Sequence, residues 1–322
     1  MTTTTFTPLV DLSSYPTPDP TFRKCAGCIT LFISFYGMIV NGYVFKGFLS
    51  SSKFRSDFYR LCTSRAAYNF IICFTFFFWS SPCTILNFYY LPYNFNLAFG
   101  ELGDFAYLSG ILTQVVIAIN RFSVSYWPMS GGRFRDKYGL YAGFGFVWTA
   151  SGIRTILALP PECGYYYELR ILSWLPEMTQ CGMALSDILL TSAFFGTAFS
   201  NTMNVLTFGK LFYDSKKSIV TLSSKESAKR RKKRIQMFTQ SCIQDLLYAF
   251  DMTIGNYCTL LYDAPWFTFL TLSVSYLSIH VLDGTIMLVF NKDLHPNSKK
   301  KKPDHDMKVV SATMSSQGPK TK

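Results

Sequence analysis

The chain of 322 residues is 49% hydrophobic and 17% aromatic but only 16% charged, with a mean hydropathy of +0.18. An ordinary soluble domain carries about 25% charged residues. This composition excludes a disordered protein, a collagen and a typical cytosolic enzyme, and it indicates a polytopic membrane protein. The formal net charge of +12 does not indicate nucleic-acid binding, because the Lys and Arg residues cluster between apolar tracts instead of lining one face of a fold.

Seven apolar tracts are long enough to cross a bilayer, which requires about 20 residues. They lie at 26–48, 66–90, 100–126, 139–159, 182–211, 235–261 and 265–290. The fourth tract contains Arg154 and the sixth contains Asp245 and Asp251, so a hydropathy threshold suited to charge-free segments could omit either one. The predicted fold is therefore an all-α membrane protein, a bundle of seven transmembrane helices.

The remaining residues lie at the two ends of the chain and in the connectors. Residues 1–25, rich in Thr and Pro, are predicted to form a largely disordered extracellular segment, residues 26–290 the seven-helix domain, and residues 291–322 a disordered, basic cytoplasmic tail. No basic region followed by a short apolar core opens the chain, so no cleaved signal peptide is expected.

The distribution of Lys and Arg predicts the orientation of the spans. In a seven-span arrangement, 27 of the 31 Lys and Arg residues lie on one side of the membrane and three on the other, with Arg154 inside a span. Because Lys and Arg are enriched in cytoplasmic connectors, the amino terminus is expected outside and the carboxy terminus inside.

The sharpest local pattern ends the third span, where Asn120-Arg121-Phe122 is followed six residues later by Pro128. A single Arg at the end of a span is often an anchor that reaches to the membrane surface. Between the third and fourth of seven spans, however, this pattern resembles the Asp-Arg-Tyr region of rhodopsin-like G-protein-coupled receptors. More specifically, it resembles the nematode serpentine chemoreceptors of class x.

Further residues, from about residue 26 to 295, carry the same resemblance. Asn41 fits the Asn of the first helix, Trp148 fits the Trp of the fourth, and Cys163, Trp174 and Cys181 fit the second outer loop of class x. The pattern also departs from the superfamily, which places a Cys near the outer end of the third span where this chain has none. Asn120 replaces the acidic partner of the Arg, Cys73 stands where a sodium-binding Asp is expected, and Asp283-Gly284-Thr-Ile-Met287 replaces Asn-Pro-x-x-Tyr.

The resemblance implies a chemosensory receptor that binds an external small molecule between its helices and activates a heterotrimeric G protein. It implies that Arg121 is the switch residue facing the G protein, oriented by Asn120, and that the protein resides in the plasma membrane, with sensory cilia suggested by the family. The basic connector before the sixth span would face the G protein, or would serve only as a positive-inside determinant touching anionic lipid. Its residues are Arg230, Arg231, Lys232, Lys233 and Arg234.

Charges inside the spans require partners or a water-filled cavity, because each costs about 2.5–3.5 kcal/mol on insertion scales. The polar residues at such positions are Asn41, Arg154, Asp187, Asp245 and Asp283. The candidate ligand pocket comprises Asp104, Tyr107, Asp251 and His280. Asp104 is alternatively an interfacial residue, Asp251 a buried carboxylate bonded to neighbouring helices, and Tyr107 a packing residue.

Nine cysteines are present, and most lie inside the spans. Cys163 and Cys181 both fall in the predicted second outer loop, where a disulfide would close a loop of roughly 18 residues, contribute about 3 kcal/mol and hold Tyr165 to Tyr167 over the pocket. Cys25 and Cys28 are the competing partners. No metal site is expected from three His, and no cofactor fingerprint occurs.

Two other functions remain open. A seven-span ligand-gated channel or transporter would use Arg154, Asp187 and Asp251 along a permeation path, but no internal repeat supports it. A non-signalling homologue would account for Asn120 and Met287. An enzyme is not expected, because no nucleophile, base and orienting residue are recognisable together.

Overall fold

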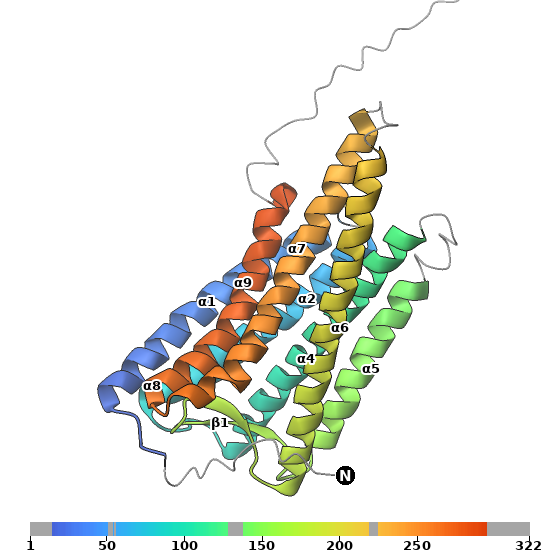
Figure 1. The fold of residues 1–322 in the computed structure, drawn as a ribbon. Coiled ribbons are helices and arrows are strands. Elements are labelled where there is room, and N and C mark those ends of the chain that lie inside the picture. The colour runs from blue at the N-terminus through green and yellow to red at the C-terminus, as the bar shows by residue number, and fades with distance from the viewer. Residues whose placement is uncertain (1–14, 51–53, 55, 128–137, 219–224, 295–322) are drawn as a thin grey trace, which may run out of the picture.

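The computed structural model describes residues 15–50, 54, 56–127, 138–218 and 225–294. The helices of these residues form seven rods. The rods run side by side (Figure 1). Their helices are α1 (Pro20–Ser50), α2 (Asp57–Thr75), α3 (Ser81–Leu86), α4 (Tyr93–Tyr126), α5 (Leu140–Ala158), α6 (Gln180–Ser218), α7 (Lys225–Asn256), α8 (Pro265–Thr268) and α9 (Ser275–Phe290). The amino-terminal segment predicted to be disordered lies mainly outside the described residues. The predicted tail lies almost entirely outside them.

Each of two rods consists of two α-helices joined by a π-helical turn. The turn Phe76–Ser80 joins α2 to α3, and the turn Phe269–Val274 joins α8 to α9. Pro82 is the second residue of α3. Its ring crowds the preceding turn and its backbone nitrogen carries no N–H donor, which gives the first interruption a local cause. Counting each interrupted helix as one rod gives the predicted seven.

Five of the rods are long and apolar enough by themselves to cross a membrane: 20–50, 57–86, 93–126, 180–213 and 265–290. The other two are α5 and α7, the fourth and sixth rods. They are the two that the sequence marks as most polar, because α5 contains Arg154 and α7 contains Asp245 and Asp251.

The helices extend beyond the predicted spans at several ends, and one of these differences changes the role of a residue. The second rod begins at Asp57, nine residues before the predicted start of the second span. Arg65, which the sequence places in a basic connector, is instead two turns inside α2 and has no solvent exposure. The second span was predicted to begin after Arg65 because it was delimited by apolar content alone.

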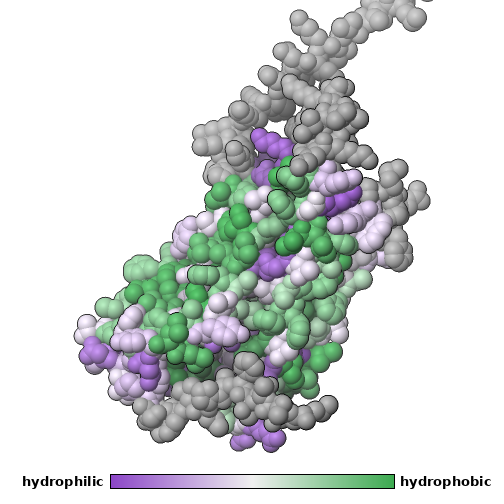
Figure 2. Space-filling view, viewed as in Figure 1, coloured by the Kyte–Doolittle hydropathy of each residue, from purple (hydrophilic) through white to green (hydrophobic). Residues whose placement is uncertain are grey.

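The outer surface of the bundle is rich in apolar side chains. Figure 2 shows them across the middle of the visible face, with hydrophilic residues nearer the ends. Exposed examples are Phe32 on α1, Ile156 on α5 and Val205 on α6. Side chains of this kind, directed away from the core, suit a hydrocarbon environment.

A short hairpin crosses one end of the bundle, called here the hairpin end, and the opposite end is called the basic end (Figure 1). Strands β1 (Tyr165–Glu168) and β2 (Ser173–Pro176) pair antiparallel, with Tyr167 opposite Trp174. Asn96 of α4 fixes the hairpin, since its Oδ1 accepts the N–H of Tyr167 at 2.8 Å and its Nδ2 donates to the Tyr167 carbonyl at 3.1 Å. The same Oδ1 accepts the indole N–H of Trp79 at 2.6 Å.

The hairpin approaches α4 so closely that Gly100 has a steric role. A Cβ at this position would overlap the carbonyl oxygen of Tyr165. We expect Gly100→Ala to displace the hairpin and to destabilise the protein by about 1–3 kcal/mol, as overpacking does elsewhere. The measurement is the melting temperature of the purified protein. Gly145→Ala on α5, where a Cβ would meet nothing within 4 Å, is the control; equal melting of the two variants would contradict the prediction.

Candidate functional site: a cavity beneath the hairpin and a buried charge cluster

A cavity of about 360 Å³ lies beneath the hairpin, between α4, α6, α7 and the π-helical turn Phe269–Val274. This volume is within the range of small-molecule sites, about 300–1,000 Å³. Most of its wall is apolar or aromatic. The polar, aromatic and methionine residues that line it include Asp104, Tyr107, Tyr165, Trp174, Met178, Met183, Ser186, Asp187, Asp251, Met252, Asn256 and Tyr276.

Three of the four predicted pocket residues line this one cavity: Asp104, Tyr107 and Asp251. They come from α4 and α7, so the fold brings together residues separated by more than 140 positions in sequence. Asp187, which was not among the predicted pocket residues, lines the cavity from α6. His280 does not line it, because this side chain packs against Tyr107 and Tyr276 one layer deeper.

Arg154 forms a charge cluster with two carboxylates on the α4 side of the cavity. Its Nη1 donates to Glu101 at 2.8 Å and its Nη2 lies 2.6 Å from Asp104. The guanidinium carbon is 5.3 Å from the centroid of the Tyr165 ring. The single positive charge of α5 is thus shared by two carboxylates of α4, which explains how Arg154 is accommodated inside a span.

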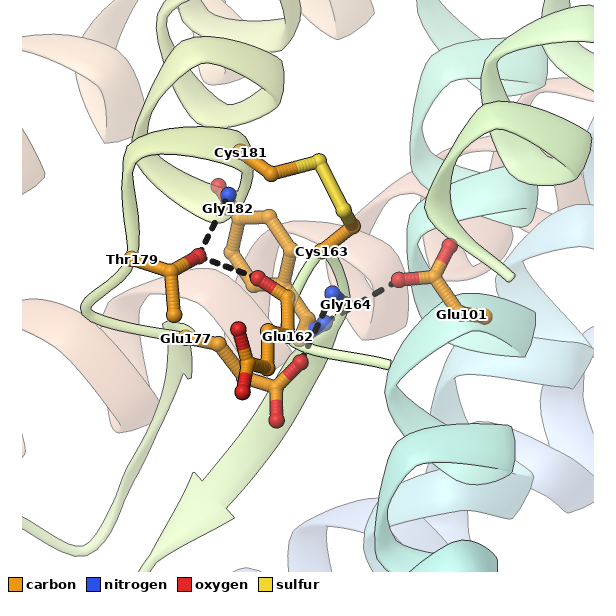
Figure 3. Close-up of a disulfide and its surroundings, with 9 residues drawn as sticks. Glu101, Glu162, Cys163, Gly164, Glu177, Thr179, Cys181 and Gly182 are labelled. Carbon is orange, nitrogen blue, oxygen red and sulfur yellow. Dashed lines mark hydrogen bonds between the residues drawn. A yellow bond between two sulfur atoms is a disulfide. The ribbon is translucent and has the colours of Figure 1, made fainter. Parts of the chain in front are cut away.

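A disulfide between Cys163 and Cys181 joins the start of the hairpin to the start of α6, with 4.9 Å between the two Cα atoms. Figure 3 shows it among the hydrogen bonds that fix this loop: the N–H of Gly164 donates to Glu177 at 3.0 Å, and the N–H of Tyr165 donates to Glu101 at 3.0 Å. The predicted pairing is confirmed, and the alternative partners Cys25 and Cys28 are free thiols.

The tyrosines of β1 have different environments. Tyr165 lines the cavity and its hydroxyl is 2.6 Å from Ser186, whereas Tyr167 is buried against Trp79 and Trp174. Burial, with the charges of Glu168 and Glu177 nearby, raises the pKa of Tyr166 to about 12. The Tyr166 phenol therefore stays protonated and neutral at physiological pH. Only Tyr165 of the three faces the cavity, so the disulfide holds one tyrosine, not three, over the site.

A second charge cluster lies deeper in the bundle and is centred on Arg65 of α2. Its Nε donates to Asp283 of α9 at 2.7 Å, and its Nη1 is 3.7 Å from Asp245 of α7. Each of the three side chains is at most 1% exposed. Asn69 and Gln244 each donate to Asp283 at 2.5 Å, so its two oxygens are both bonded.

The same cluster includes α6, because Asn204 donates to Asp245 at 2.6 Å. The guanidinium of Arg65 also lies 5.2 Å from the Tyr248 ring centroid. Asn41, predicted as a polar residue of the first span, donates to the carbonyl of His280 at 3.2 Å, next to the cluster. The predicted polar residues Asn41, Asp245 and Asp283 thus gather in one region, around an Arg that the sequence did not assign to it.

Arg121 lies near the basic end of α4 and contacts α7. Its Nη2 donates to the carbonyl oxygen of Met237, and its guanidinium carbon is 4.5 Å from the Phe58 ring centroid and 5.9 Å from that of Phe238. No carboxylate in the described part of the chain is within ion-pair distance of it. No hydrogen bond joins its side chain to that of Asn120 among the residues described.

The basic stretch before the sixth span is the first part of α7, which begins at Lys225. The side chains of Arg230, Arg231 and Arg234 lie outside the described set. Lys232 and Lys233 are exposed, and the ammonium of Lys233 is 5.5 Å from the Tyr59 ring centroid. Among the described residues, no group of three or more His, Cys, Asp or Glu could hold a metal ion.

Sequence reasoning missed Glu101, Asn96, Arg65, Asn69 and Gln244. A usable signal was present for the last three, because polar residues recur every fourth position on one face of a helix. The spacing applies to Arg65 and Asn69 on α2, and to Gln240, Gln244 and Tyr248 on α7. A polar stripe of this kind inside a membrane helix faces protein, not lipid.

Comparisons with known proteins agree with this arrangement. The model of the serpentine type 7TM GPCR chemoreceptor Srx family matches residues 31–291. Serpentine receptor class X 45 of Caenorhabditis elegans is 25% identical over 292 residues, which is 84% of this chain and 79% of that protein. The crystal structure of squid rhodopsin superimposes with a TM-score of 0.70 at 14% identity, covering 87% of this chain and 85% of that chain.

The rhodopsin likeness shows the fold, and the family match covers most of the chain. The family consists of receptors and not enzymes, which agrees with the prediction from sequence. The chain is thus a multi-pass membrane protein and belongs to the Srx family of serpentine seven-transmembrane G-protein-coupled chemoreceptors.

Proposed function

We propose that the protein is a chemosensory receptor of the plasma membrane that binds an external small molecule in the 360 Å³ cavity and activates a heterotrimeric G protein at its basic end. The hairpin end faces outside in this proposal, as the distribution of Lys and Arg predicts. The observation that carries the proposal is the pairing, within one bundle, of a roofed cavity at one end with Arg121 bound to α7 at the other.

A continuous set of contacts supports coupling between the cavity and the Arg65 cluster. Tyr107 lines the cavity, and its ring centroid is 6.4 Å from that of Tyr248. The Tyr248 ring is 5.7 Å from His280, whose Nδ1 is 2.9 Å from the Asn69 oxygen. Asn69 in turn donates to Asp283 at 2.5 Å. A ligand that shifts Tyr107 would therefore act on the Arg65 cluster through packed or bonded side chains.

Activation in this proposal is a population shift toward a state in which the basic end of α7 moves away from α4. Such a movement would break the bond from Arg121 to Met237 and lengthen the 3.7 Å contact between Arg65 and Asp245. A ligand drives the shift only by its preference for the second state. Lys232, Lys233 and their basic neighbours would then border the crevice that admits the G protein.

The test records G-protein activation and membrane current together in cells that express the receptor at their surface, during exposure to pooled volatile and water-soluble odorants. G-protein activation by a pool supports the receptor. A current that persists with G proteins blocked would replace it with a ligand-gated channel. Binding without either response, measured as thermal stabilisation of the purified protein, would indicate a non-signalling homologue.

We expect Arg121→Ala to abolish G-protein activation while surface expression stays near that of the parent protein. The side chain contributes no ion pair among the described residues, so its loss removes the contact with α7 at modest structural cost. Surface labelling and G-protein activation, measured on the same cells, check this. Lys46→Ala, which removes an exposed charge of α1 near the same end of the bundle, is the control. Normal signalling by the Arg121 variant would refute this role.

A further inference from the structure

We propose that the ligand of the cavity is a small organic cation whose ammonium group is bound by Asp251, with the rings of Tyr107 and Tyr276 beside that group. This inference rests on the proposed function for the role of the site, but it concerns binding alone. It follows from the charges of the cavity, the surroundings of Asp251 and the aromatic residues beside it.

The charges that line the cavity are all negative. Asp104, Asp187 and Asp251 contribute carboxylates, and no Lys, Arg or His of the described residues lines it. Arg154 lies beside the cavity, and its two terminal nitrogens already form ion pairs with Glu101 and Asp104. The site therefore has an excess of negative charge that no described protein group balances.

Asp251 is the carboxylate best placed to bind a cation. The residue is only 7% exposed, and it lines the cavity. One oxygen accepts a hydrogen bond from Ser275 at 2.7 Å. The other oxygen has no donor among the described residues, and no cation of that set lies within ion-pair distance. A buried carboxylate without a positive partner is costly, and an ammonium group would provide both charge and donors.

The ring systems beside Asp251 suit the same kind of ligand. Tyr107 and Tyr276 line the cavity with their ring centroids 5.4 Å apart. The face of an aromatic ring attracts a cation, and the effect grows when water is excluded. Trp174 and Met252 extend the apolar wall. An amine of modest size with an apolar body thus matches both the charge and the lining.

A neutral or acidic ligand fits the cavity less well. A neutral ligand would leave the free oxygen of Asp251 without a charged partner, and a carboxylate ligand would add a fourth negative charge to the three that line the wall. The electrostatic repulsion between like charges at such short distances is strong where the dielectric constant is low. The sign of the charge, and not the shape alone, therefore selects the ligand class.

The test compares ligands that share one skeleton and differ in charge. 2-Phenylethylamine, 2-phenylethanol and phenylacetic acid form one such set, and a shorter and a longer alkyl series provide two more. Each compound is added to the full-length purified receptor, and binding is measured as the rise in melting temperature without any G protein. We expect the amines to stabilise the receptor and the matched alcohols and acids to have little effect.

Substitution at Asp251 tests the residue. Asp251→Asn keeps the shape and the bond from Ser275, and should weaken amine binding roughly 10- to 100-fold, as the loss of a hydrogen bond to a charged group implies. Asp251→Glu, which retains the charge, should recover part of the affinity. Asp187→Asn, at an exposed position of the wall, should change affinity less. Full amine affinity in Asp251→Asn would overturn the assignment of this residue.

The outcomes separate this inference from the proposed function. Amine binding that depends on Asp251 but never activates a G protein supports the ligand class and contradicts the signalling role. Activation by alcohols or acids with equal or greater stabilisation supports the receptor and overturns the ligand class. Stabilisation by none of the amines at millimolar concentration also overturns it.

Discussion

Replacing Arg65 with Met is expected to lower stability by about 3–5 kcal/mol, the largest stability loss of any single substitution considered for this protein. The change leaves Asp245 and Asp283 buried with no cation at their side, at exposures of 1% and 0%. Uncompensated buried charge is far more costly than the loss of the pair itself. The expected observations are a much lower melting temperature in detergent and loss of the protein from the cell surface.

Two variants show whether charge is the cause. Adding Asp245→Asn and Asp283→Asn to Arg65→Met removes all three charges, so the triple variant should recover much of the lost stability. Arg60 is an exposed Arg that precedes Arg65 on α2, and Arg60→Met should change stability by no more than about 0.5 kcal/mol. Equal melting of the Arg65 and Arg60 variants would refute the structural role of the cluster.

Removal of the disulfide by Cys163→Ser is expected to cost about 3 kcal/mol, since the bond closes a loop between residues 18 apart. The hydrogen bonds from Asn96 hold the far part of the hairpin independently, so we expect loosening near Gly164 and Tyr165 and not loss of the whole hairpin. The melting temperature and the proteolysis rate of the 163–181 loop measure the two effects.

The matched control removes thiols that have no partner. Cys25→Ser and Cys28→Ser change exposed free cysteines of α1 and should leave both measurements as in the parent. Cys181→Ser should reproduce the Cys163 variant, because each leaves the other thiol unpaired. A parent-like melting temperature in either disulfide variant would show that the hydrogen bonds alone hold the loop.

The fold was largely predictable from sequence, because hydropathy and the placement of Lys and Arg are local properties. The two marginal spans, with Arg154 in α5 and Asp245 in α7, were also predictable as marginal. Arg65 was not assigned correctly. Hydropathy treats a charge as the end of a span, and only the three-dimensional arrangement reveals that Asp245 and Asp283 are close enough to neutralise it.

The candidate site was predictable in part, because residue type and position along an apolar tract are also local properties. Asp104 and Asp251 are unusual within apolar tracts, so composition alone singled them out, and the structure places both on one cavity. Which of them is already paired could not be known, because the partner of Asp104 lies on another helix. His280 stood out equally in the sequence, yet packing places it below Tyr107 and away from the cavity.

The positions of the charged partners along the chain bear on how the protein enters the membrane during synthesis. Arg154 emerges from the ribosome after Glu101 and Asp104, and Asp245 emerges after Arg65. Each helix that hydropathy alone would leave out of the bilayer therefore reaches the translocon when its opposite charge has already been inserted. Arg65 itself lies only two turns from the start of α2 and can extend its side chain toward the membrane surface until its partners arrive. The linear order of the helices thus favours the biogenesis of the two most polar spans.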